Sequence, residues 1–506
     1  MPRFMGTETE YGISTPTDPM LSPIVTSTHA VVAFAGKDRR AQWDFGPESP
    51  LKDSRGFDLR RYHTVPTIDP DALGVANVMT ANGSRFYVDH AHPEYSAPET
   101  TNAFDAMLYD AAGDVVLNQA VAAVATQTAA GRSVLKDHDP CPPLKIYKNN
   151  VDGKGASYGA HENYMYSRGT DFEVLAQALI PFFVARQVIT GAGRVGIGPA
   201  GQTPGFQISQ RADYIEQEIS LETTLNRGII NTRDEPHTDA ERWGRLHVII
   251  GDANMSHTAM VLKLGMTSLV LDSIESGTNF TDLRLVDPVG DVRRVSRDLQ
   301  CTARLTLVDG RELTAIDILR AYRDRVSASS DVDEQVLRLW DEVMDLLADD
   351  PLSTSHLLDW TAKYALLNSY ANRGVSWDDP KMALIDLQYS DIDPAKSLYH
   401  ALVRKNRMRT LVSAEQIAQA AAHPPADSRA FFRGHMMTRF RDRIAAANWD
   451  SIVVELADGS LVRILMTNLG GLTKQQVAAM CDTATTVDDL VAALRSAGLT
   501  EFEPVT

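Results

Sequence analysis

Residues 85–99 contain the pattern that most constrains how this chain folds. The segment reads RFYVDHAHPEYSAPE, and its first five residues alternate between polar and apolar side chains, which predicts a β-strand with one polar face. The polar positions are Arg85, Tyr87 and Asp89, and the apolar positions are Phe86 and Val88. Core packing alone would not place a cation, a phenol and a carboxylate in a row on one side. An exposed edge strand would give the same pattern, so this segment alone leaves both interpretations open.

The second half of the segment is expected to return toward the polar face. Pro93 has no N–H group to donate to a strand ladder, so the chain should bend near His92 and Pro93. Glu94 and Glu99 could then fold back to the side of Asp89.

A similar alternation occurs near the N-terminus. Residues 4–11 read FMGTETEY and predict a strand with Glu8 and Glu10 on one face. Two carboxylates this close repel each other when they are buried, unless a cation lies between them. A solvent-facing strand edge is the alternative, and this stretch does not distinguish the two.

The composition argues against several classes of partner. The 506 residues carry a formal net charge of −17, so nucleic acid would meet a field of its own sign. No apolar run approaches the roughly 18 residues needed to span a bilayer, and the N-terminus lacks the apolar region of a signal peptide. The three cysteines match no metal or disulfide spacing. We therefore expect a cytoplasmic protein with no nucleic-acid or membrane partner.

The length predicts one large domain and a smaller one. Residues 1–427 would form the large domain and residues 428–506 a small α+β domain. Residues 36–73 are rich in Gly, Pro and charged residues and show no periodicity, which indicates an inserted loop. Composition does not decide whether this insert is a functional lid or a passive loop.

Helical spacing of apolar residues is clear at residues 101–130, 172–190 and 428–447. Gly113 is expected to divide the first helix, and Pro181 to kink or break the second.

Two motif matches lack the context that their functions need. Residues 191–196 match G-x-G-x-x-G but follow a predicted helix rather than a strand, which argues against a Rossmann site. Residues 155–159 match G-x-S-x-G, but a polar loop precedes them where a nucleophile elbow needs a buried strand. A serine amidase is therefore disfavoured.

Three more segments add polar groups to the predicted sheet. Arg211 would lie on the polar side of a strand at 206–211, Arg233 follows a short apolar run, and His247 lies within a buried strand. A lone buried imidazole is more often a hydrogen-bonded core residue than a ligand. Taken together, the segments fit an antiparallel sheet with one wet face, where carboxylates and imidazoles suit Mg²⁺ and arginines suit phosphate. The chain has no P-loop motif, so our hypothesis is an ATP site on the floor of a sheet.

Five segments also carry a resemblance to a known family. They read GTETEYG (6–12), YVDHAHPEY (87–95), HENY (161–164), NTRDEPH (231–237) and LHVIIGD (246–252). In this order, over essentially the whole chain, they resemble the Pup ligase/depupylase family, which is related in fold to glutamine synthetase and the carboxylate–amine ligases. The chain is more similar to the family's depupylases than to its ligases. The grounds are the insert after Ala35, the DHAHPE form of the central motif and NNVDGKG at 149–155.

The resemblance implies an α+β fold: a glutamine-synthetase-like antiparallel sheet cradle backed by helices, with a small α+β C-terminal domain. It implies that Mg²⁺ and ATP, or ADP with phosphate, bind on the sheet. The implied magnesium residues are Glu8, Tyr87 and Glu94; the implied nucleotide contacts are Arg85 and Trp449; the implied catalytic carboxylate is Asp89. Chemistry alone adds Glu10, His161 and His247 as metal ligands and Arg211, Arg233 and Asn163 as nucleotide contacts.

The implied reaction is hydrolysis at the C-terminal Gln of Pup. The free carboxamide and the isopeptide bond to a lysine are amides of the same γ-carbonyl, so one site would deamidate Pup and release it from pupylated proteins. Asp89 would attack the carbonyl, or activate a water or a phosphate oxygen, and the sequence does not choose between these. In this family the nucleotide is a cofactor of hydrolysis and is not consumed in each turnover.

Three alternatives remain open at this stage. One is a ligase of the same fold, which consumes ATP. Another is a nucleotide-independent metal hydrolase built on His90, His92, His161 and His247. The third is a non-catalytic Pup-binding protein. The oligomeric state cannot be derived from the sequence, and a monomer is favoured.

Overall fold

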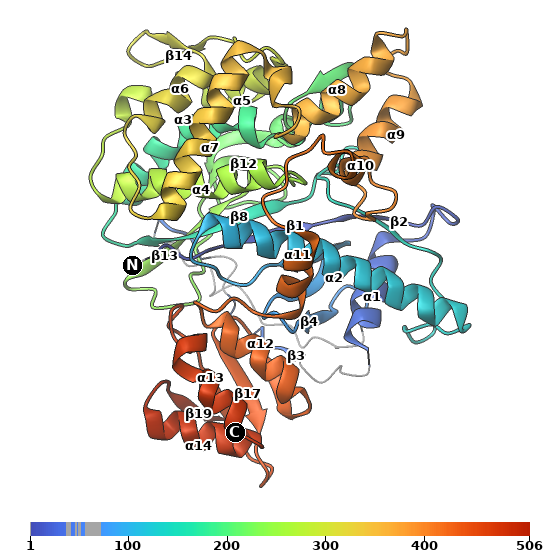
Figure 1. The fold of residues 1–506 in the computed structure, drawn as a ribbon, viewed down its shortest axis with the longest axis vertical. Coiled ribbons are helices and arrows are strands. Elements are labelled where there is room, and N and C mark those ends of the chain that lie inside the picture. The colour runs from blue at the N-terminus through green and yellow to red at the C-terminus, as the bar shows by residue number, and fades with distance from the viewer. Residues whose placement is uncertain (1, 37–41, 46–47, 49–51, 56–71, 506) are drawn as a thin grey trace.

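An eight-stranded sheet lies at the centre of the computed structural model, which describes residues 2–36, 42–45, 48, 52–55 and 72–505 (Figure 1). In sheet order its strands are β11 (Ile215–Ser220), β12 (Arg227–Asn231), β13 (Trp243–Val248), β8 (Ala160–Ser167), β1 (Met5–Glu10), β6 (His92–Ser96), β5 (Arg85–Asp89) and β4 (Asn77–Met79). Its strands pair antiparallel, as predicted, except β11 and β12, which are parallel, so the sheet is mixed. The candidate lid at 36–73 lies largely outside the described residues.

Strand β5 has the two faces that its alternation predicts. Phe86 and Val88 are buried in a hydrophobic cluster with residues of α1 (Pro23–Ala35) and α2 (Ala103–Ala129). The polar side chains of β5 line a cavity on the other face. Burial of the apolar side against two helices therefore directs the polar side away from the core.

Helices α3 (Phe172–Thr190) and α4 (His257–Glu275) cover the other half of the same sheet face, where they contact β12 and β8. Helix α3 continues through Pro181 without a break, so of the two predicted outcomes the break is wrong and the kink stays a prediction. By length and composition α3 could cross a membrane, but 78% of its most apolar window is buried inside the structure. The helix has its predicted bounds, but the sequence analysis expected no apolar run of this length; its burial makes it a core helix.

Helix α2 is likewise continuous across Gly113, where the sequence predicted a division. A Cβ atom at Gly113 would lie 2.5 Å from Cδ1 of Tyr95, so the glycine makes room for this ring of β6. The residue is therefore a close-packing position and not a helix end.

Strand β1 is held to α2 by side-chain hydrogen bonds. The hydroxyl groups of Thr7 and Thr9 both donate to Oδ1 of Asp110, at 3.0 and 3.1 Å. The buried ammonium of Lys148 donates to Oδ2 of Asp110 at 2.7 Å. Side chains alternate along a strand, so Thr7 and Thr9 project toward α2. Glu8 and Glu10 project to the opposite face of the sheet.

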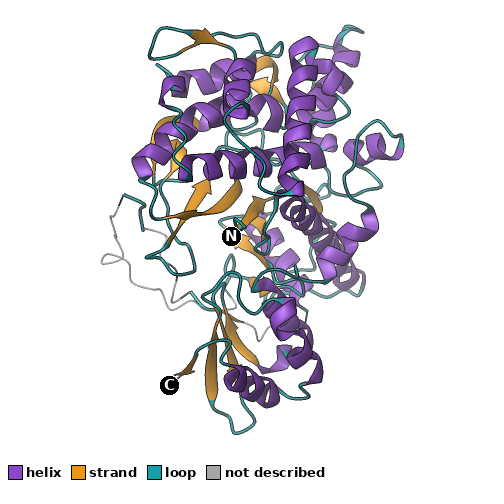
Figure 2. Ribbon diagram, turned by 60° about the vertical axis from the view of Figure 1, so that its left-hand side comes forward, coloured by secondary structure: helices purple, strands orange, loops and turns teal. Residues whose placement is uncertain are grey.

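A second sheet lies toward the C-terminus, at one end of the molecule (Figure 2). Its order is β19 (Phe502–Val505), β18 (Leu461–Leu465), β17 (Ser451–Glu455), β16 (Ile444–Ala447) and β3 (Gln42–Trp43). Helices α12 (Ala430–Arg439), α13 (Lys474–Thr483) and α14 (Val487–Ala497) share a buried hydrophobic cluster with it. Strands β17 and β18 form an antiparallel hairpin. The predicted helix at 428–447 is too long, because residues 444–447 pair with β17 instead. The domain division at residue 427 stays a prediction.

The remaining elements complete the helical layer and its connections. The helices are α5 (Pro288–Arg297), α6 (Ala315–Arg323), α7 (Asp331–Asp349), α8 (Asp359–Ala371), α9 (Pro380–Tyr389), α10 (Leu398–Arg404) and α11 (Ala414–Ala422). Short 3₁₀ turns lie at Ala212–Tyr214, Thr281–Leu283, Pro351–Thr354 and Arg441–Arg443. Three strand pairs stand apart: β2 (Gly12–Ser14) with β7 (Lys145–Tyr147), β9 (Arg194–Ile197) with β10 (Thr203–Gln207), and β14 (Leu305–Thr306) with β15 (Glu312–Leu313).

Candidate active site

A cavity of about 530 Å³ lies on the polar face of the main sheet. It brings together most of the residues that the sequence proposed as a site. The predicted residues in its lining are Glu8, Glu10, Arg85, Tyr87, Asp89, Glu94, His161, Arg211, Arg233 and Trp449. The other two predicted residues, Asn163 and His247, do not line this cavity, but both contact Glu8.

Strand register explains the convergence. In the pairing of β1 with its two neighbours, Glu8 lies opposite His161 of β8, and Glu10 lies opposite Glu94 of β6. Glu94 in turn lies opposite Tyr87 of β5. Residues directly opposite on antiparallel strands project to the same face, so four strands supply one row of polar side chains.

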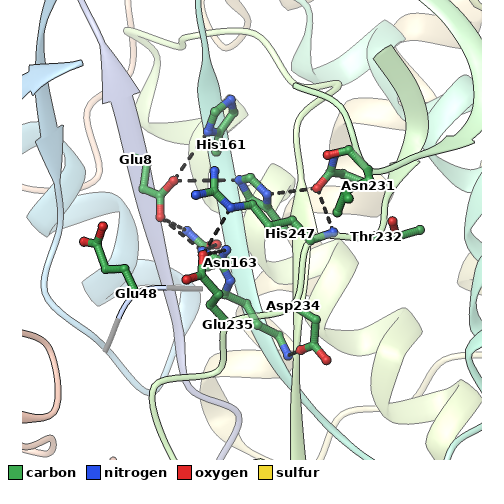
Figure 3. Close-up of polar contacts among 12 residues, drawn as sticks. Glu8, Glu48, His161, Asn163, Asn231, Thr232, Asp234, Glu235 and His247 are labelled. Atoms are coloured by element: carbon green, nitrogen blue, oxygen red, sulfur yellow. Dashed lines mark hydrogen bonds and ion pairs between the residues drawn. The ribbon is translucent and has the colours of Figure 1, made fainter. Parts of the chain in front are cut away.

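Glu8 is the centre of the first group of candidate metal ligands (Figure 3). Its Oε2 lies 3.4 Å from Nδ1 of His161 and 3.7 Å from Nε2 of His247. Its Oε1 accepts a hydrogen bond from Asn163 at 3.0 Å and lies 3.5 Å from Nη1 of Arg245. Burial alone would raise the pKa of Glu8, but the hydrogen bond with His161 and the nearby charge of Arg245 hold it well below its usual value. Glu8 is therefore a carboxylate at neutral pH.

His247 is both a core residue and a candidate ligand. Its Nδ1 lies 3.1 Å from Oδ1 of Asn231, an oxygen that also accepts from the backbone of Arg233. Nδ1 is thus the donor, which leaves Nε2 as a lone-pair nitrogen. Nε2 is buried without a hydrogen-bond partner, and burial lowers the pKa of His247 well below its usual value. A neutral imidazole with an unused lone pair beside a carboxylate fits a divalent cation.

We expect Glu8→Gln to weaken magnesium-dependent nucleotide binding about tenfold or more, because the amide keeps the size of the side chain but removes a charged ligand. Calorimetric titration of ADP with and without Mg²⁺ measures this effect. Glu334→Gln removes one exposed partner of a surface ion pair on α7 and is the matched control. Equal stimulation by Mg²⁺ in Glu8→Gln and wild type would contradict a ligand role for Glu8.

A second group of candidate ligands consists of Glu10, Asp89 and Glu94. One oxygen from each carboxylate lies within 4.8 Å of the others. Burial, together with the charges of Asp89, Glu10 and Glu8, raises the pKa of Glu94 well above its usual value. Three buried or half-buried acids this close call for a cation, so the residues fit a magnesium ion.

Asp89 differs from the other two acids in its exposure. Its side chain is 41% exposed, compared with 11% for Glu10, and Glu94 is buried. Its Oδ2 lies 3.1 Å from Nδ1 of His90, in the tight turn that joins β5 to β6. Burial alone would raise the pKa of Asp89, but the hydrogen bond and charge of His90 lower it. Asp89 is thus an ionised carboxylate that a substrate can reach.

Arg85 is held between two aromatic rings. Its guanidinium carbon lies 3.8 Å from the ring centre of Trp43 and 3.9 Å from that of Tyr87. The same group donates to Asn77 at 2.7 Å and contacts Glu48 at 3.4 Å. The ring of Trp449 packs edge-on against Trp43, at 5.5 Å between ring centres. Sequence reasoning placed Trp43 only within a candidate lid, because nothing in the local pattern links it to β5.

Glu99 does not fold back toward Asp89, which corrects the prediction for this residue. It accepts hydrogen bonds from Arg429, at 2.7 Å, and from Arg433 of α12. Burial alone would raise the pKa of Glu99, but the charges of Arg433 and Arg429 lower it to about 2. Arg433 also donates to the backbone oxygen of Trp449 at 3.0 Å. The acid therefore links the main sheet to the segment that bears Trp449.

Arg211 is in the cavity, but not on a strand as predicted. Strand β10 ends at Gln207, and Arg211 starts the short 3₁₀ turn that follows. Two further arginines of the lining, Arg227 and Arg245, were missed. A signal existed for Arg245, because it alternates with Leu246 on the strand that carries His247. None existed for Arg227, whose strand is buried along its whole length.

The four histidines of the nucleotide-independent alternative do not form one site among the described residues. His161 and His247 share Glu8, at 4.8 Å between their ring centres. His92 contacts Glu10 at 3.1 Å, and His90 contacts Asp89. The two motif matches also lack their contexts: residues 191–196 directly follow α3, and residues 155–159 lie in a loop ahead of β8.

The comparisons with known proteins decide the family. A family model described as "Pup-ligase protein" matches residues 3–453. The chain belongs to the Pup-ligase family. A Pup deamidase/depupylase of Mycolicibacterium smegmatis is 51% identical to it over 505 residues, which cover 97% of this chain and 99% of that protein. The family resemblance predicted from the motifs is therefore confirmed.

Two solved structures place the fold within the same Pup-ligase family. The complex between Pup and its ligase PafA matches with a TM-score of 0.77 and 28% identity, over 99% of this chain and 95% of that chain. PafA in complex with ADP matches with a TM-score of 0.70 and 30% identity, over 83% of this chain and 94% of that chain. This member of the family is thus more similar in sequence to the deamidase/depupylase than to either ligase structure, as its motifs predicted.

Proposed function

We propose that the chain is a nucleotide-dependent hydrolase that deamidates the C-terminal Gln of Pup and cleaves the isopeptide bond between Pup and lysine. The observation that carries the proposal is the accessible carboxylate of Asp89 beside two groups of candidate metal ligands in one cavity. Full-length similarity to a protein named Pup deamidase/depupylase supports this activity over that of the ligases.

We place ATP, or ADP with phosphate, together with Mg²⁺ in this cavity. Glu8, His161 and His247 would hold one cation, and Glu10 and Glu94 another, with the phenol of Tyr87 beside Glu94. Arg85, Arg233 and Trp449 would contact the nucleotide, and Asn163 would orient Glu8. When bound, Mg²⁺ would supply the positive charge that polarises the scissile carbonyl.

Asp89 would act on the γ-carbonyl of the C-terminal residue. It either attacks that carbon directly or removes a proton from an attacking water. In both routes the C–N bond breaks, and water supplies the oxygen of the new carboxylate. The leaving group is ammonia from free Pup, or the lysine amine from a pupylated protein. His90 holds Asp89 in its ionised form, which both routes need.

Ammonia release from Pup that ends in Gln tests the proposal. We expect release in the presence of ADP and Mg²⁺, or of a non-hydrolysable ATP analogue, and loss of release without nucleotide. A ligase would release no ammonia and would need ATP in stoichiometric amount. Release that persists without nucleotide and stops only with chelators would support the metal hydrolase instead.

We further propose that the protein acts in the cytoplasm. Its three cysteines are buried and unpaired, which fits a reducing compartment.

A further inference from the structure

Two arginines that line the cavity, Arg211 and Arg227, form no ion pair with an acid among the described residues. Arg227 donates to the backbone oxygens of Thr223, at 2.7 Å, and Ser157, at 2.9 Å. Arg211 donates to the backbone oxygen of Tyr158 and contacts the hydroxyl group of Ser157 at 3.3 Å. Among the described residues, no carboxylate oxygen lies within 4.0 Å of either guanidinium group. Their hydrogen-bond partners in the described part of the chain are all neutral, while Glu10 attracts both guanidinium groups from farther away.

The other arginines of the cavity are paired. Arg233 lies 3.1 Å from Glu235, Arg245 lies 3.5 Å from Glu8, and Arg85 lies 3.4 Å from Glu48. The lack of an acid is therefore a property of Arg211 and Arg227, and not of the cavity as a whole.

Both guanidinium groups are buried close to each other. Arg211 is 1% exposed and Arg227 8%, and Nε of Arg211 is buried without a hydrogen-bond partner. Burial, together with the charge of Arg227, lowers the pKa of Arg211 to about 10, so it stays charged at neutral pH. Two buried like charges repel each other, and an anion bound between them would offset that cost.

The position of the pair indicates which anion it receives. The turn at Ser157–Gly159 accepts hydrogen bonds from both arginines and donates the N–H of Gly159 to Glu10 at 2.8 Å. The ring of Tyr158 in the same turn stacks on His92, at 4.2 Å between ring centres. The pair thus adjoins the group of acids that contains Asp89. Arg245 adjoins Glu8, and Arg233 lies near both Glu8 and Asp89 but is paired with Glu235.

We propose that Arg211 and Arg227 bind the α-carboxylate of the C-terminal residue of Pup. This inference rests on the proposed function, in which Asp89 acts on the side-chain carbonyl of that same residue. The α-carboxylate lies only a few bonds from that carbonyl, so an anchor beside the acid group would hold the carbonyl at Asp89. It is free both in Pup that ends in Gln and in Pup joined to lysine through the γ-carbonyl. One anchor therefore serves both substrates, whatever the leaving group.

Removal of the charge from the substrate tests this on the wild-type protein. Pup that ends in Gln is compared with the same chain ending in Gln α-N-methylamide, whose only primary carboxamide at that residue is the side chain. We expect kcat/KM for ammonia release to fall about tenfold or more with the N-methylamide, because a charge-assisted bidentate contact is lost. Equal values for the two substrates would overturn the inference. No release from either substrate would instead mean that the proposed function is wrong.

The same pair of substrates assigns the effect to Arg227. With the free acid, kcat/KM of Arg227→Met should fall as far as kcat/KM of wild type falls when the N-methylamide replaces the free acid. With the N-methylamide as substrate, Arg227→Met should have nearly the same kcat/KM as wild type. Arg227→Lys should recover part of the preference for the free acid over the N-methylamide. Arg338→Met, which removes an exposed cation of α7, is the matched control and should keep the full preference. A thermal melt checks that each variant folds.

Nucleotide phosphate is the other oxyanion that two arginines could bind. The affinities for ADP and for inorganic phosphate distinguish a phosphate site from a site for the α-carboxylate of Pup. We expect Arg227→Met to change both affinities less than threefold. An Arg227→Met variant that binds phosphate tenfold more weakly, yet still discriminates against the N-methylamide, would overturn the inference.

Discussion

Asp89→Asn should reduce the rate of ammonia release from Pup by about 10³-fold. The amide has the size of the acid but is neither a nucleophile nor a base, and loss of such a group typically costs 10²- to 10⁴-fold. The side chain of Asp89 is 41% exposed, so the substitution should leave folding almost unchanged. Single-turnover release from saturating Pup measures the chemical step directly.

Nucleotide binding provides the control for this variant. ADP affinity in the presence of Mg²⁺ should change by only a few-fold, since Glu10 and Glu94 still contribute to the second group of ligands. Activity within threefold of wild type would remove Asp89 from the mechanism. An equal fall in ADP affinity and in rate would make it a metal ligand only.

Glu99→Ala should destabilise the protein by about 3–5 kcal/mol. The substitution leaves the guanidinium groups of Arg429 and Arg433 buried without their acid; the two side chains are 2% and 0% exposed. Removal of one partner of a buried ion pair typically costs this much. Chemical unfolding followed by tryptophan fluorescence measures the change. Glu334→Ala, in an exposed pair on α7, should cost less than about 1 kcal/mol.

The same pair predicts acid sensitivity with a definite sign. Arg433 and Arg429 lower the pKa of Glu99 to about 2, below its unfolded value of about 4.5. Its contribution to stability is therefore complete above pH 4.5 and is lost as the pH falls toward 2. Glu99→Gln should show a shallower loss over this range than wild type. Parallel stability–pH curves for the two proteins would contradict the assignment.

Local patterns in the sequence predicted the faces of single strands well. The alternation of Arg85 to Asp89 requires only that one side be buried, and the helices beneath the sheet supply that burial. The row of site residues also depends on which strands pair and in which register. Glu10 meets Glu94 through a pairing between distant segments, and the local patterns predicted a shared polar face without giving this register.

The misses share one physical cause: they depend on contacts that sequence spacing does not contain. Gly113 permits the close approach of Tyr95, so it does not end a helix. Residues 444–447 leave a helical pattern because β17 offers them strand partners. Glu99 turns away from the cavity because two arginines more than 300 residues later attract it. Arg227 is in a fully buried strand that shows no polar alternation.

The two threonines of β1 that are fastened to Asp110 have a consequence for how the cavity fills. Because these hydrogen bonds fix the backbone on either side of Glu8, this part of the cradle would already be ordered before the proposed magnesium and nucleotide bind. The entropy lost in ordering these ligands then belongs to the folding of the chain and not to each binding event. Under the proposed function, exchange of the cofactor would then require no reordering of the strand that carries these ligands.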